Sequence, residues 1–510
     1  MVNVHIPGVA VALTAAALAL VQPAAARQGD SAPVDPEAVL AKAVQSTGLA
    51  HVKALRLTGY GSDFLFGQAY DGHTPWPRFH VSRYVLDIDF QARAVREERV
   101  RHQAQDPPRG GGNQPIAEQR QVWAYRDGVA WNGEGESATR AGLERDRRTA
   151  AEARRLGIAL TPRGFVELVQ AAGSAALLEA RANGVVVRVP GPDGTVLRGE
   201  LSADGDVRRI ETQHATPVLG DTLFEASFSD YRTVDEARVP HRIIHRQGGY
   251  PILDITVEKA EVNAHLEFDV PAHLRGAPAD PAPVDSPVAL APGVWRIALG
   301  PRDRCVVVEF RDHLLVVEAP QGEPEALDAL RQIHELYPDK PVRYIVNTHI
   351  HFDHSGGLRT FAAEGAAVVT HVSNVDYYEQ VWSQPRTIAP DRLAQSGRSP
   401  EFVGIVGSRT FTDGERNVVV YHYGGNHAHH PGMLMVYLPA ERILVEADSF
   451  NPPANPEARP NATPNLADFI DAVDRLRLEV DVLVPTHGRL TTLDEARRAA
   501  ARFAPAAGGR

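Results

Sequence analysis

The sequence predicts an α+β protein: an antiparallel β-rich N-terminal domain with a few helices, followed by a C-terminal domain in which strands and helices alternate. Short alternating runs separated by turn residues recur through the first half. In the second half, apolar runs repeatedly end in side chains that can bind metal. A Pro- and Ala-rich stretch, residues 276–287, separates the two halves and has the composition of a linker. The predicted division is therefore a leader over 1–26, a β-rich domain over 35–275, the linker, and a second domain over 288–510.

In the N-terminal half, residues 78–90 alternate between apolar and polar, which places Tyr84, Leu86 and Ile88 on one face of a strand. Further strands are expected at 121–125, 184–189, 207–212, 241–245 and 252–257. Turn residues between several of these runs predict an antiparallel meander. Helices are expected over 138–156, which is rich in Ala, Arg and Glu, and over 162–171, which carries one apolar stripe.

Composition is that of a globular protein with ample cores. The chain has 510 residues, of which 43% are hydrophobic and 23% charged, and its formal net charge is −11. That charge opposes attraction of nucleic acid, and no Lys/Arg cluster accompanies the metal-binding side chains. We expect a small-molecule substrate and no nucleic-acid partner.

The N-terminus predicts export. Residues 9–21 form an apolar run of thirteen residues, too short to span a membrane, and the small residues of 22–26 resemble a signal-peptidase site. The first five residues contain no Lys or Arg, which departs from the usual leader. A periplasmic or secreted protein without a membrane span is expected. With a single cysteine, Cys305, it can form no internal disulfide.

The most informative stretch is 348–357, which places three histidines and an aspartate within six residues after the strand-like run 342–346. His349 and His351 are two apart and share a direction in extended backbone, whereas Asp353 and His354 are adjacent and must diverge. One turn can therefore serve two metal ions.

Three later strand ends supply further metal-binding side chains. A histidine cluster over 426–430 contains His427, His429 and His430, and Asp448 and His487 follow two other apolar runs. Three imidazoles in four residues cannot all reach one ion.

This ordered pattern resembles the metallo-β-lactamase superfamily, whose signature is an H-x-H-x-D-H turn, a third histidine, a bridging carboxylate and a final histidine. The resemblance covers the chain from about Pro287 onward and implies a four-layer αββα sandwich. It implies that His349, His351 and His429 hold a first metal, with His427 as the fallback for His429 and with His430 outside the ligand set. Asp353, His354 and His487 would hold a second metal, and Asp448 would bridge the two. The family often has Asp where Glu318 stands, a difference that concerns support of the turn.

The donor set suits zinc best, two ions per chain, although manganese or iron can occupy similar sites. Cys305 is expected to be a buried packing residue, so no cysteine ligand is available. In the family that the chain resembles, a bridging Asp such as Asp448 implies a glyoxalase II/lactonase-like site rather than dedicated antibiotic hydrolysis. The resemblance implies a metal-bridging hydroxide that cleaves an ester, thioester, lactone or lactam, with Asp353 as the residue that orients it and accepts its proton.

Two other functions stay open. The N-terminal β domain could be the working part of a periplasmic carrier or binding protein, or the same scaffold could hold one iron for thiol or persulfide oxidation. Metal content separates hydrolysis from oxidation. Substrate contacts are undetermined: Tyr377, Tyr378 and Trp382 fit either a pocket wall or core packing.

Overall fold

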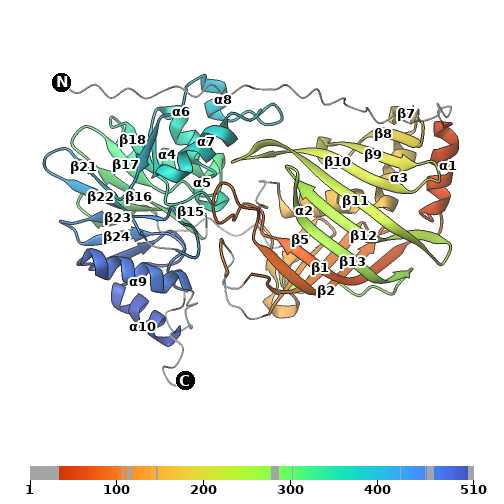
Figure 1. Cartoon of the computed structure of the whole chain (residues 1–510), viewed down its shortest axis with the longest axis horizontal. Coiled ribbons are helices and arrows are strands. Elements are labelled where there is room, and N and C mark those ends of the chain that lie inside the picture. The colour runs from red at the N-terminus through yellow and green to blue at the C-terminus, as the bar shows by residue number, and fades with distance from the viewer. Residues whose placement is uncertain are drawn as a thin grey trace, which may run out of the picture.

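The structure is a computed structural model that describes residues 34–105, 108–111, 118–144, 148–276, 286–300, 302–424, 427–453, 455 and 464–503. Two β-rich bodies lie side by side along the long axis of the molecule (Figure 1). The predicted leader and nearly all of the predicted linker lie outside the described residues. None of the helices in the described part of the chain combines the length and hydropathy needed to span a bilayer.

The first body is one antiparallel sheet of 13 strands in the order β6-β5-β4-β3-β2-β1-β13-β12-β11-β10-β9-β8-β7. It is a meander that folds back on itself, because β13 returns to pair with β1. Five of the six predicted strand runs fall within strands and the sixth, 78–90, matches a strand except for its last residue, so the predicted antiparallel β-rich half is confirmed. The strands are β1 (Ala54–Phe64), β2 (Arg78–Asp89), β3 (Ala94–Gln103), β4 (Gln119–Arg126), β5 (Val129–Asn132), β6 (Thr139–Arg140), β7 (Leu177–Arg181), β8 (Gly184–Pro190), β9 (Val196–Ser202), β10 (Val207–Thr216), β11 (Gly220–Val234), β12 (Ala237–Gln247) and β13 (Tyr250–Val262).

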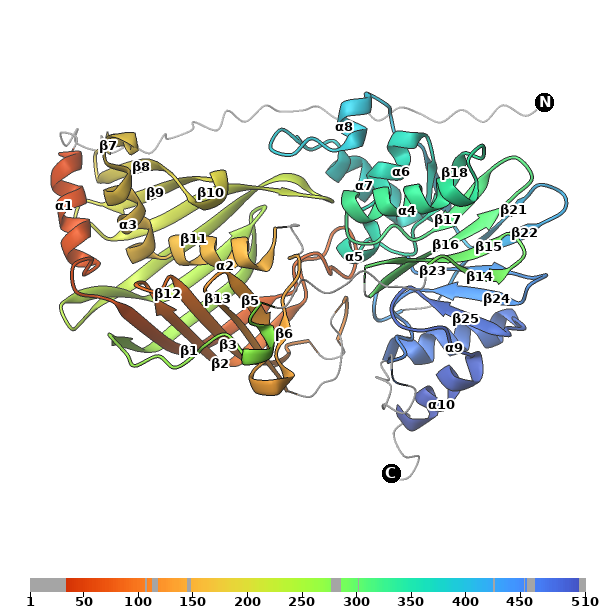
Figure 2. The same cartoon turned by 180° about the vertical axis from the view of Figure 1, so that it is seen from behind.

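Helices α1 (Pro36–Ser46), α2 (Ala150–Ala159) and α3 (Pro162–Ala172) pack against this curled sheet (Figure 2). The predicted helix over 162–171 is confirmed. The predicted helix over 138–156 is wrong in its first half, where β6 forms instead and Leu143 makes an isolated bridge with Thr149. The helix begins only after Thr149, whose side chain and that of Glu152 form a reciprocal capping box. The helix-favouring composition before Thr149 does not make the helix start earlier, because the cap is at Thr149.

The second body has two sheets. The seven-stranded sheet has the order β14-β15-β16-β17-β18-β19-β20 and the five-stranded sheet the order β21-β22-β23-β24-β25. Their strands are β14 (Val288–Ala291), β15 (Val294–Leu299), β16 (Asp303–Glu309), β17 (Leu314–Val317), β18 (Val342–Val346), β19 (Ala367–His371), β20 (Phe402–Ile405), β21 (Ser408–Thr412), β22 (Asn417–His422), β23 (Leu434–Leu438), β24 (Ile443–Glu446) and β25 (Val482–Pro485).

Alternation within the strands builds four layers. Val306 and Val436 lie in the core between the two sheets, whereas Val307 faces helices on the outer side of the larger sheet and Met435 faces helices on the outer side of the smaller one. The predicted αββα sandwich is therefore present. The helices are α4 (Glu323–Leu336), α5 (Phe352–Ser355), α6 (Leu358–Glu364), α7 (Val375–Trp382), α8 (Arg392–Ser396), α9 (Pro464–Leu476) and α10 (Leu493–Phe503). The 3-10 helices are η1 (Gly135–Ser137), η2 (Gly173–Ala175), η3 (Pro192–Gly194), η4 (Ala272–Leu274) and η5 (Val372–Asn374).

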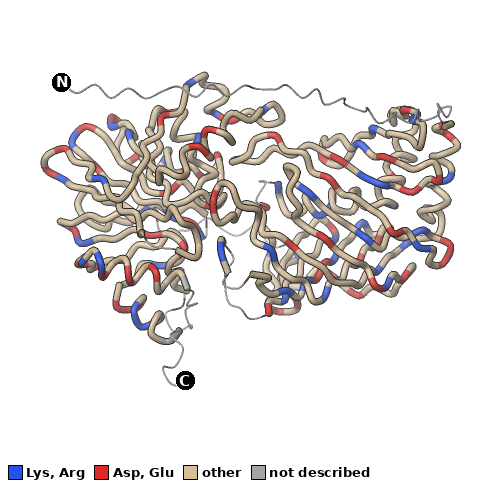
Figure 3. Tube along the Cα trace, in the orientation of Figure 1, with Lys and Arg blue, Asp and Glu red and all other residues tan. Residues whose placement is uncertain are grey.

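Parallel pairing places the predicted metal-binding side chains together. β18 lies between the parallel strands β17 and β19, and β24 pairs parallel with β25, so the carboxyl ends of β24 and β25 share one edge of their sheet. Asp448 and His487 follow these two ends, and the His349 turn follows β18 in the facing sheet. Lys, Arg, Asp and Glu are interspersed over both bodies (Figure 3).

Candidate metal centre

The turn after β18 is held by a buried asparagine. The Asn347 side-chain amide donates hydrogen bonds to the carbonyl oxygens of His349 (2.6 Å) and His354 (3.3 Å). Its Oδ1 accepts a 2.6 Å hydrogen bond from the hydroxyl of Tyr378. Since Asn347 and Tyr378 are fully buried, the backbone of the turn is fixed before any ligand binds.

The first group of metal-binding side chains consists of His349, His351, His429 and Asp448, whose donor atoms all lie within 4.8 Å of one another. Nε2 of His349 is 2.9 Å from Nδ1 of His351 and 3.3 Å from Nε2 of His429. Nitrogens bound tetrahedrally to zinc at about 2.0–2.1 Å lie about 3.3 Å apart. The spacing of this group is therefore close to that of nitrogens around one metal ion.

Asp353, His354 and His487 form the second group. Nε2 of His354 lies 3.1 Å from Nε2 of His487 and 3.1 Å from Oδ2 of Asp448. Asp448 Oδ2 is also 3.1 Å from Nε2 of His429 in the first group. This carboxylate lies between the two groups, so all seven residues singled out in the sequence come together.

The structure separates the three histidines of the loop between β22 and β23. His429 lies in the first group. His427 instead packs its ring edge-on against Tyr423 at 5.0 Å, and burial lowers its pKa to about 3. Nδ1 of His430 accepts a hydrogen bond from the Gly432 amide at 3.0 Å.

Outer hydrogen bonds decide which nitrogen of each ring is free. Nε2 of His351 lies 2.9 Å from the carbonyl of Ala69, which can only accept, so Nδ1 keeps its lone pair for a metal. Likewise Nδ1 of His354 lies 2.5 Å from Glu318, and Nδ1 of His487 lies 2.9 Å from a carboxylate oxygen of Asp303 as an ion-pair contact. Nε2 of each of those two rings is then directed toward Asp448.

Glu318 supports both the turn and a ring. One carboxylate oxygen accepts the amide of Thr348 at 2.8 Å, and the other faces His354. The residue is buried and has a φ of 73°, a conformation that costs free energy for a side chain other than glycine. The side chain of Glu318, longer than that of the Asp often found at this position in the family, thus supports the turn.

Electrostatics favour a cation at this position. Burial, with neighbouring histidines, lowers the pKa values of His349 and His351 well below their ordinary value. Burial opposes the charged forms of His354 and Asp448 as well. For this pair the mutual attraction prevails, so the pKa of His354 is raised and that of Asp448 is lowered. His349 and His351 are therefore in the neutral form that metal binding requires, and a bound cation would replace the proton that Asp448 and Glu318 hold on His354.

A loop of the N-terminal body, residues 65–77 between β1 and β2, completes the surroundings of the centre. Nε2 of Gln68 donates a 2.6 Å hydrogen bond to Oδ1 of Asp353, and the carbonyl of Gly67 accepts the amide of Phe352 at 3.1 Å. Gln68 is buried. Gln68 and Ala69 could not be predicted from the sequence, because neither belongs to a metal-binding pattern and their partners are almost 300 residues away.

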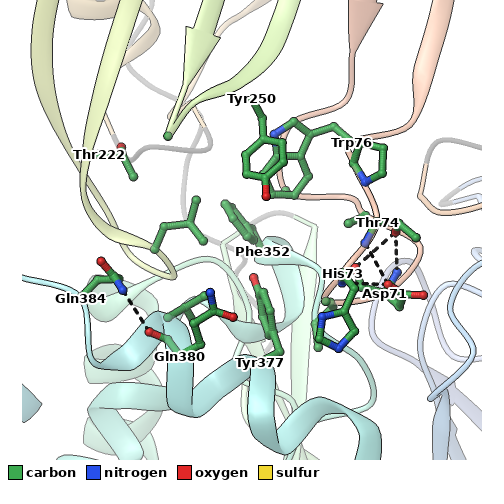
Figure 4. A pocket seen from close by; sticks show the side chains of 18 of the residues that line it. Asp71, His73, Thr74, Trp76, Thr222, Tyr250, Phe352, Tyr377, Gln380 and Gln384 are labelled. Atoms are coloured by element: carbon green, nitrogen blue, oxygen red, sulfur yellow. Dashed lines mark hydrogen bonds between the residues drawn. The ribbon is translucent and has the colours of Figure 1, made fainter. Parts of the chain in front are cut away.

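A cavity of about 360 Å³ lies between the two bodies beside the metal turn. Phe352 of the turn, Trp76 and Tyr250 of the N-terminal body, and Tyr377 of α7 line it (Figure 4). Of the three aromatic residues left open above, Tyr377 is therefore a wall residue. Tyr378 is buried core that supports Asn347.

Comparison with known proteins identifies the C-terminal region. Residues 305–487 match the family model of the metallo-beta-lactamase superfamily. Together with the four observed layers, this match shows that the C-terminal region has the metallo-β-lactamase fold. A linear primary-alkylsulfatase from a Pseudomonas species is 23% identical over 219 residues, which are 36% of this chain and 41% of that protein. The match thus spans less than half of the relative's length.

Solved structures were also compared. A metallo-beta-lactamase from Pontibacter korlensis matches with 20% identity and a TM-score of 0.31, covering 42% of this chain and 97% of that one. A rubredoxin oxygen:oxidoreductase from Desulfovibrio gigas matches with 13% identity and a TM-score of 0.33, covering 43% and 60%. Scores this low carry no argument about activity, and the fold assignment rests on the family model and the layers.

Proposed function

We propose that this chain, whose C-terminal region has the metallo-β-lactamase fold, is an exported hydrolase that holds two zinc ions and cleaves an ester, thioester, lactone or lactam. One observation carries the proposal: two groups of metal-binding side chains meet at a shared carboxylate, Asp448. His349, His351 and His429 would hold one ion, Asp353, His354 and His487 the other, with Asp448 between them.

The donor chemistry agrees with zinc. The set offers imidazole nitrogens and carboxylate oxygens, and the one cysteine, Cys305, is buried in the core, where burial raises its pKa to about 12. Two bound zinc ions would supply Lewis acidity toward a carbonyl group and a hydroxide nucleophile at neutral pH.

The protein's own contribution is orientation and proton transfer. Asp353 is held by Gln68 through one oxygen, which fixes the direction of its carboxylate. A carboxylate oriented in this way can accept the proton of a nucleophile and pass it to the leaving group. The cavity lined by Phe352, Trp76 and Tyr377 lies beside the turn and offers an apolar wall to the substrate.

The test combines metal analysis with a hydrolysis screen. Purified protein should contain two zinc ions per chain and cleave at least one class among chromogenic esters, thioesters, lactones and β-lactams. Because one relative is named as an alkylsulfatase, alkyl sulfates belong in the screen. One iron per chain with thiol oxidation would replace the proposal with the oxidoreductase alternative.

Variants tie turnover to the centre. His351→Ala and His429→Ala should lose zinc and turnover while the N-terminal body stays folded, whereas His427→Ala should keep both, because His427 lies outside the two groups. Asp353→Asn should lower kcat more than it raises KM. Wild-type rates in His351→Ala would refute the assignment.

Export is a separate part of the proposal. It is supported by the apolar run of residues 9–21 and the small residues after it. Fractionation of cells expressing the full chain should find a shortened protein outside the cytoplasm. A full-length protein that stays in the cytoplasm would contradict export without affecting the hydrolase assignment.

A further inference from the structure

A second cavity, of about 500 Å³, lies inside the N-terminal body on the concave side of its sheet. Its walls come from strands on both sides of the pairing of β1 with β13, and from α2. Small-molecule sites in proteins usually have volumes of about 300–1,000 Å³ and mostly apolar walls. No residue of the metal centre lines this cavity.

One end of the cavity is apolar. Leu55 of β1 pairs across the sheet with Ile88 of β2, which pairs in turn with Val95 of β3, and all three line the cavity. Leu57 of β1 and Leu86 of β2, which pair with each other, also line it. This end has the surface expected of a site for a hydrocarbon chain.

The other end is polar and lies further along the same strands. Asp63, eight residues beyond Leu55 on β1, lies roughly 26 Å from it at the usual rise of a strand. Its Oδ2 accepts hydrogen bonds from Arg99 (3.1 Å) and Arg101 (2.8 Å), and Arg99 also donates to Glu97 at 2.7 Å. All four side chains line the cavity.

These charges are already balanced, since two guanidinium groups face two carboxylates. Two further arginines of the cavity wall lie in α2 and in the segment before it. Arg154 of α2 donates hydrogen bonds to the carbonyls of Ala124 and Trp131 and lies 3.9 Å from Glu144. Nη2 of Arg148 lies 3.4 Å from His214.

Two acceptors of the polar end lack a donor. Oδ1 of Asp63 and Oε1 of Gln121 are buried and have no hydrogen-bond partner among the described residues, and both residues line the cavity. A buried acceptor without a donor costs free energy, which a ligand that donates a hydrogen bond would recover.

We propose that this cavity binds a single-chain amphiphile with a neutral hydroxyl head, such as a long-chain primary alcohol. The chain lies toward Leu55 and the hydroxyl donates to Oδ1 of Asp63. A carboxylate head would be repelled by Asp63 and Glu97, whose charges already offset those of Arg99 and Arg101, and an ammonium head would be repelled by the two arginines. All residues of this site belong to the N-terminal body, so the proposal does not depend on the proposed hydrolysis.

The test is displacement of a neutral fluorescent probe, N-phenyl-1-naphthylamine, from the full chain by dodecanol, dodecanoate or dodecylamine. Dodecanol should displace the probe at about tenfold lower concentration than either charged compound, the discrimination expected for a hydrogen bond to a charged group. Gln121→Leu removes the second unpaired acceptor without changing any charge and should keep that preference, because the hydroxyl donates to Asp63.

A matched pair of variants locates the site. Gly157 of α2 lines the cavity, and a Cβ built there meets no atom within 4 Å, so larger side chains fit the helix. Gly157→Trp should fill the cavity and abolish displacement by dodecanol, whereas Gly157→Ala should bind as the natural protein does. Both variants replace the same helical glycine, so a difference in dodecanol binding between them reports whether the side chain fills the cavity.

Three outcomes would overturn the proposal: no displacement by any of the compounds, tightest binding of dodecanoate or dodecylamine, or equal dodecanol binding by Gly157→Trp and Gly157→Ala. The readout needs neither turnover nor metal. A protein that binds dodecanol but fails every hydrolysis assay would retain this site and lose the proposed function.

Discussion

At the scale of single residues, the contact between Gln68 and Asp353 makes the N-terminal body part of the metal centre. Gln68→Ala removes the 2.6 Å hydrogen bond that orients the Asp353 carboxylate. Loss of such an outer partner typically costs about 10- to 100-fold in activity or metal affinity. Steady-state kinetics and chelator competition on the same preparation should show a drop of that size in both kcat and zinc retention.

The matched control is Gln384→Ala. Gln384 also lines the cavity between the bodies, but its side-chain amide donates to the carbonyl of Gln380 and contacts no metal-binding residue. This variant should keep its zinc. Equal behaviour of the two variants would show that Gln68 does not position Asp353.

Glu318 offers a second residue-scale prediction. Glu318→Ala leaves the amide of Thr348 and Nδ1 of His354 without an acceptor in a buried site. Removing one partner of a buried charged pair costs about 3–5 kcal/mol, so urea unfolding should show a loss of that order. Glu318→Gln keeps an oxygen for Thr348 and should lose less. Similar stability of the alanine variant and the natural protein would contradict the supporting role.

The residue patterns predicted the metal-binding side chains because their spacing is local. His349 and His351 share a direction in any extended segment, and each later member follows its own apolar run. Gln68 and Ala69 have no such local pattern. Their roles arise only because the β1–β2 loop reaches the turn in the folded molecule.

At the scale of elements, strand periodicity was a better guide than composition. The alternating run over 78–90 became β2 with Tyr84 and Ile88 buried. The Ala- and Arg-rich stretch over 138–156 divided between β6 and α2, because the cap at Thr149 sets where the helix begins.

β12 carries a titratable group whose effect on stability has a definite sign. His245 lines the cavity inside the N-terminal body, and burial lowers its pKa from 6.5 to about 4. Between those values the unfolded chain binds a proton that the folded chain does not. The contribution of His245 to stability is therefore fully present above pH 6.5 and is lost as the pH falls toward 4.

His245→Phe removes this titration and keeps a ring beside Phe224. Urea unfolding at pH 7.5, 6 and 5 should show that the free energy of unfolding of the natural protein falls relative to the variant as the pH decreases. A difference between the two proteins that stays constant over this range would contradict the assigned shift.

At the scale of the whole molecule, the two bodies are joined by a buried arginine. Arg386 of the C-terminal body donates to the carbonyls of Thr216 (3.1 Å), Pro217 (2.9 Å) and Val218 (2.8 Å), in the hairpin between β10 and β11. Asp221 of the same hairpin accepts the amide of Thr387 at 2.6 Å. The bodies are thus held together by hydrogen bonds to the main chain as well as by the loop at the metal turn.

Arg386→Ala should weaken this junction by about 3 kcal/mol, since three hydrogen bonds of about 1 kcal/mol each are lost. Hydrogen exchange of residues 216–221 should become faster, while exchange in the interior of β8 and β9 stays slow. Arg392→Ala is the control, because Arg392 pairs with Glu364 on the exposed surface of the C-terminal body. Unchanged exchange at 216–221 in Arg386→Ala would show that the arginine does not hold the junction.

By itself the sequence determined the class of each half and the side chains that gather at the metal centre, because periodicity and spacing act within single strands and turns. The folded molecule alone brings Gln68 and Ala69 to the centre, pairs β1 with β13, and forms a cavity with one polar end inside the meander. Those features depend on contacts between segments that are distant in the chain. The free energy of such contacts cannot be read from the local pattern of apolar and polar residues.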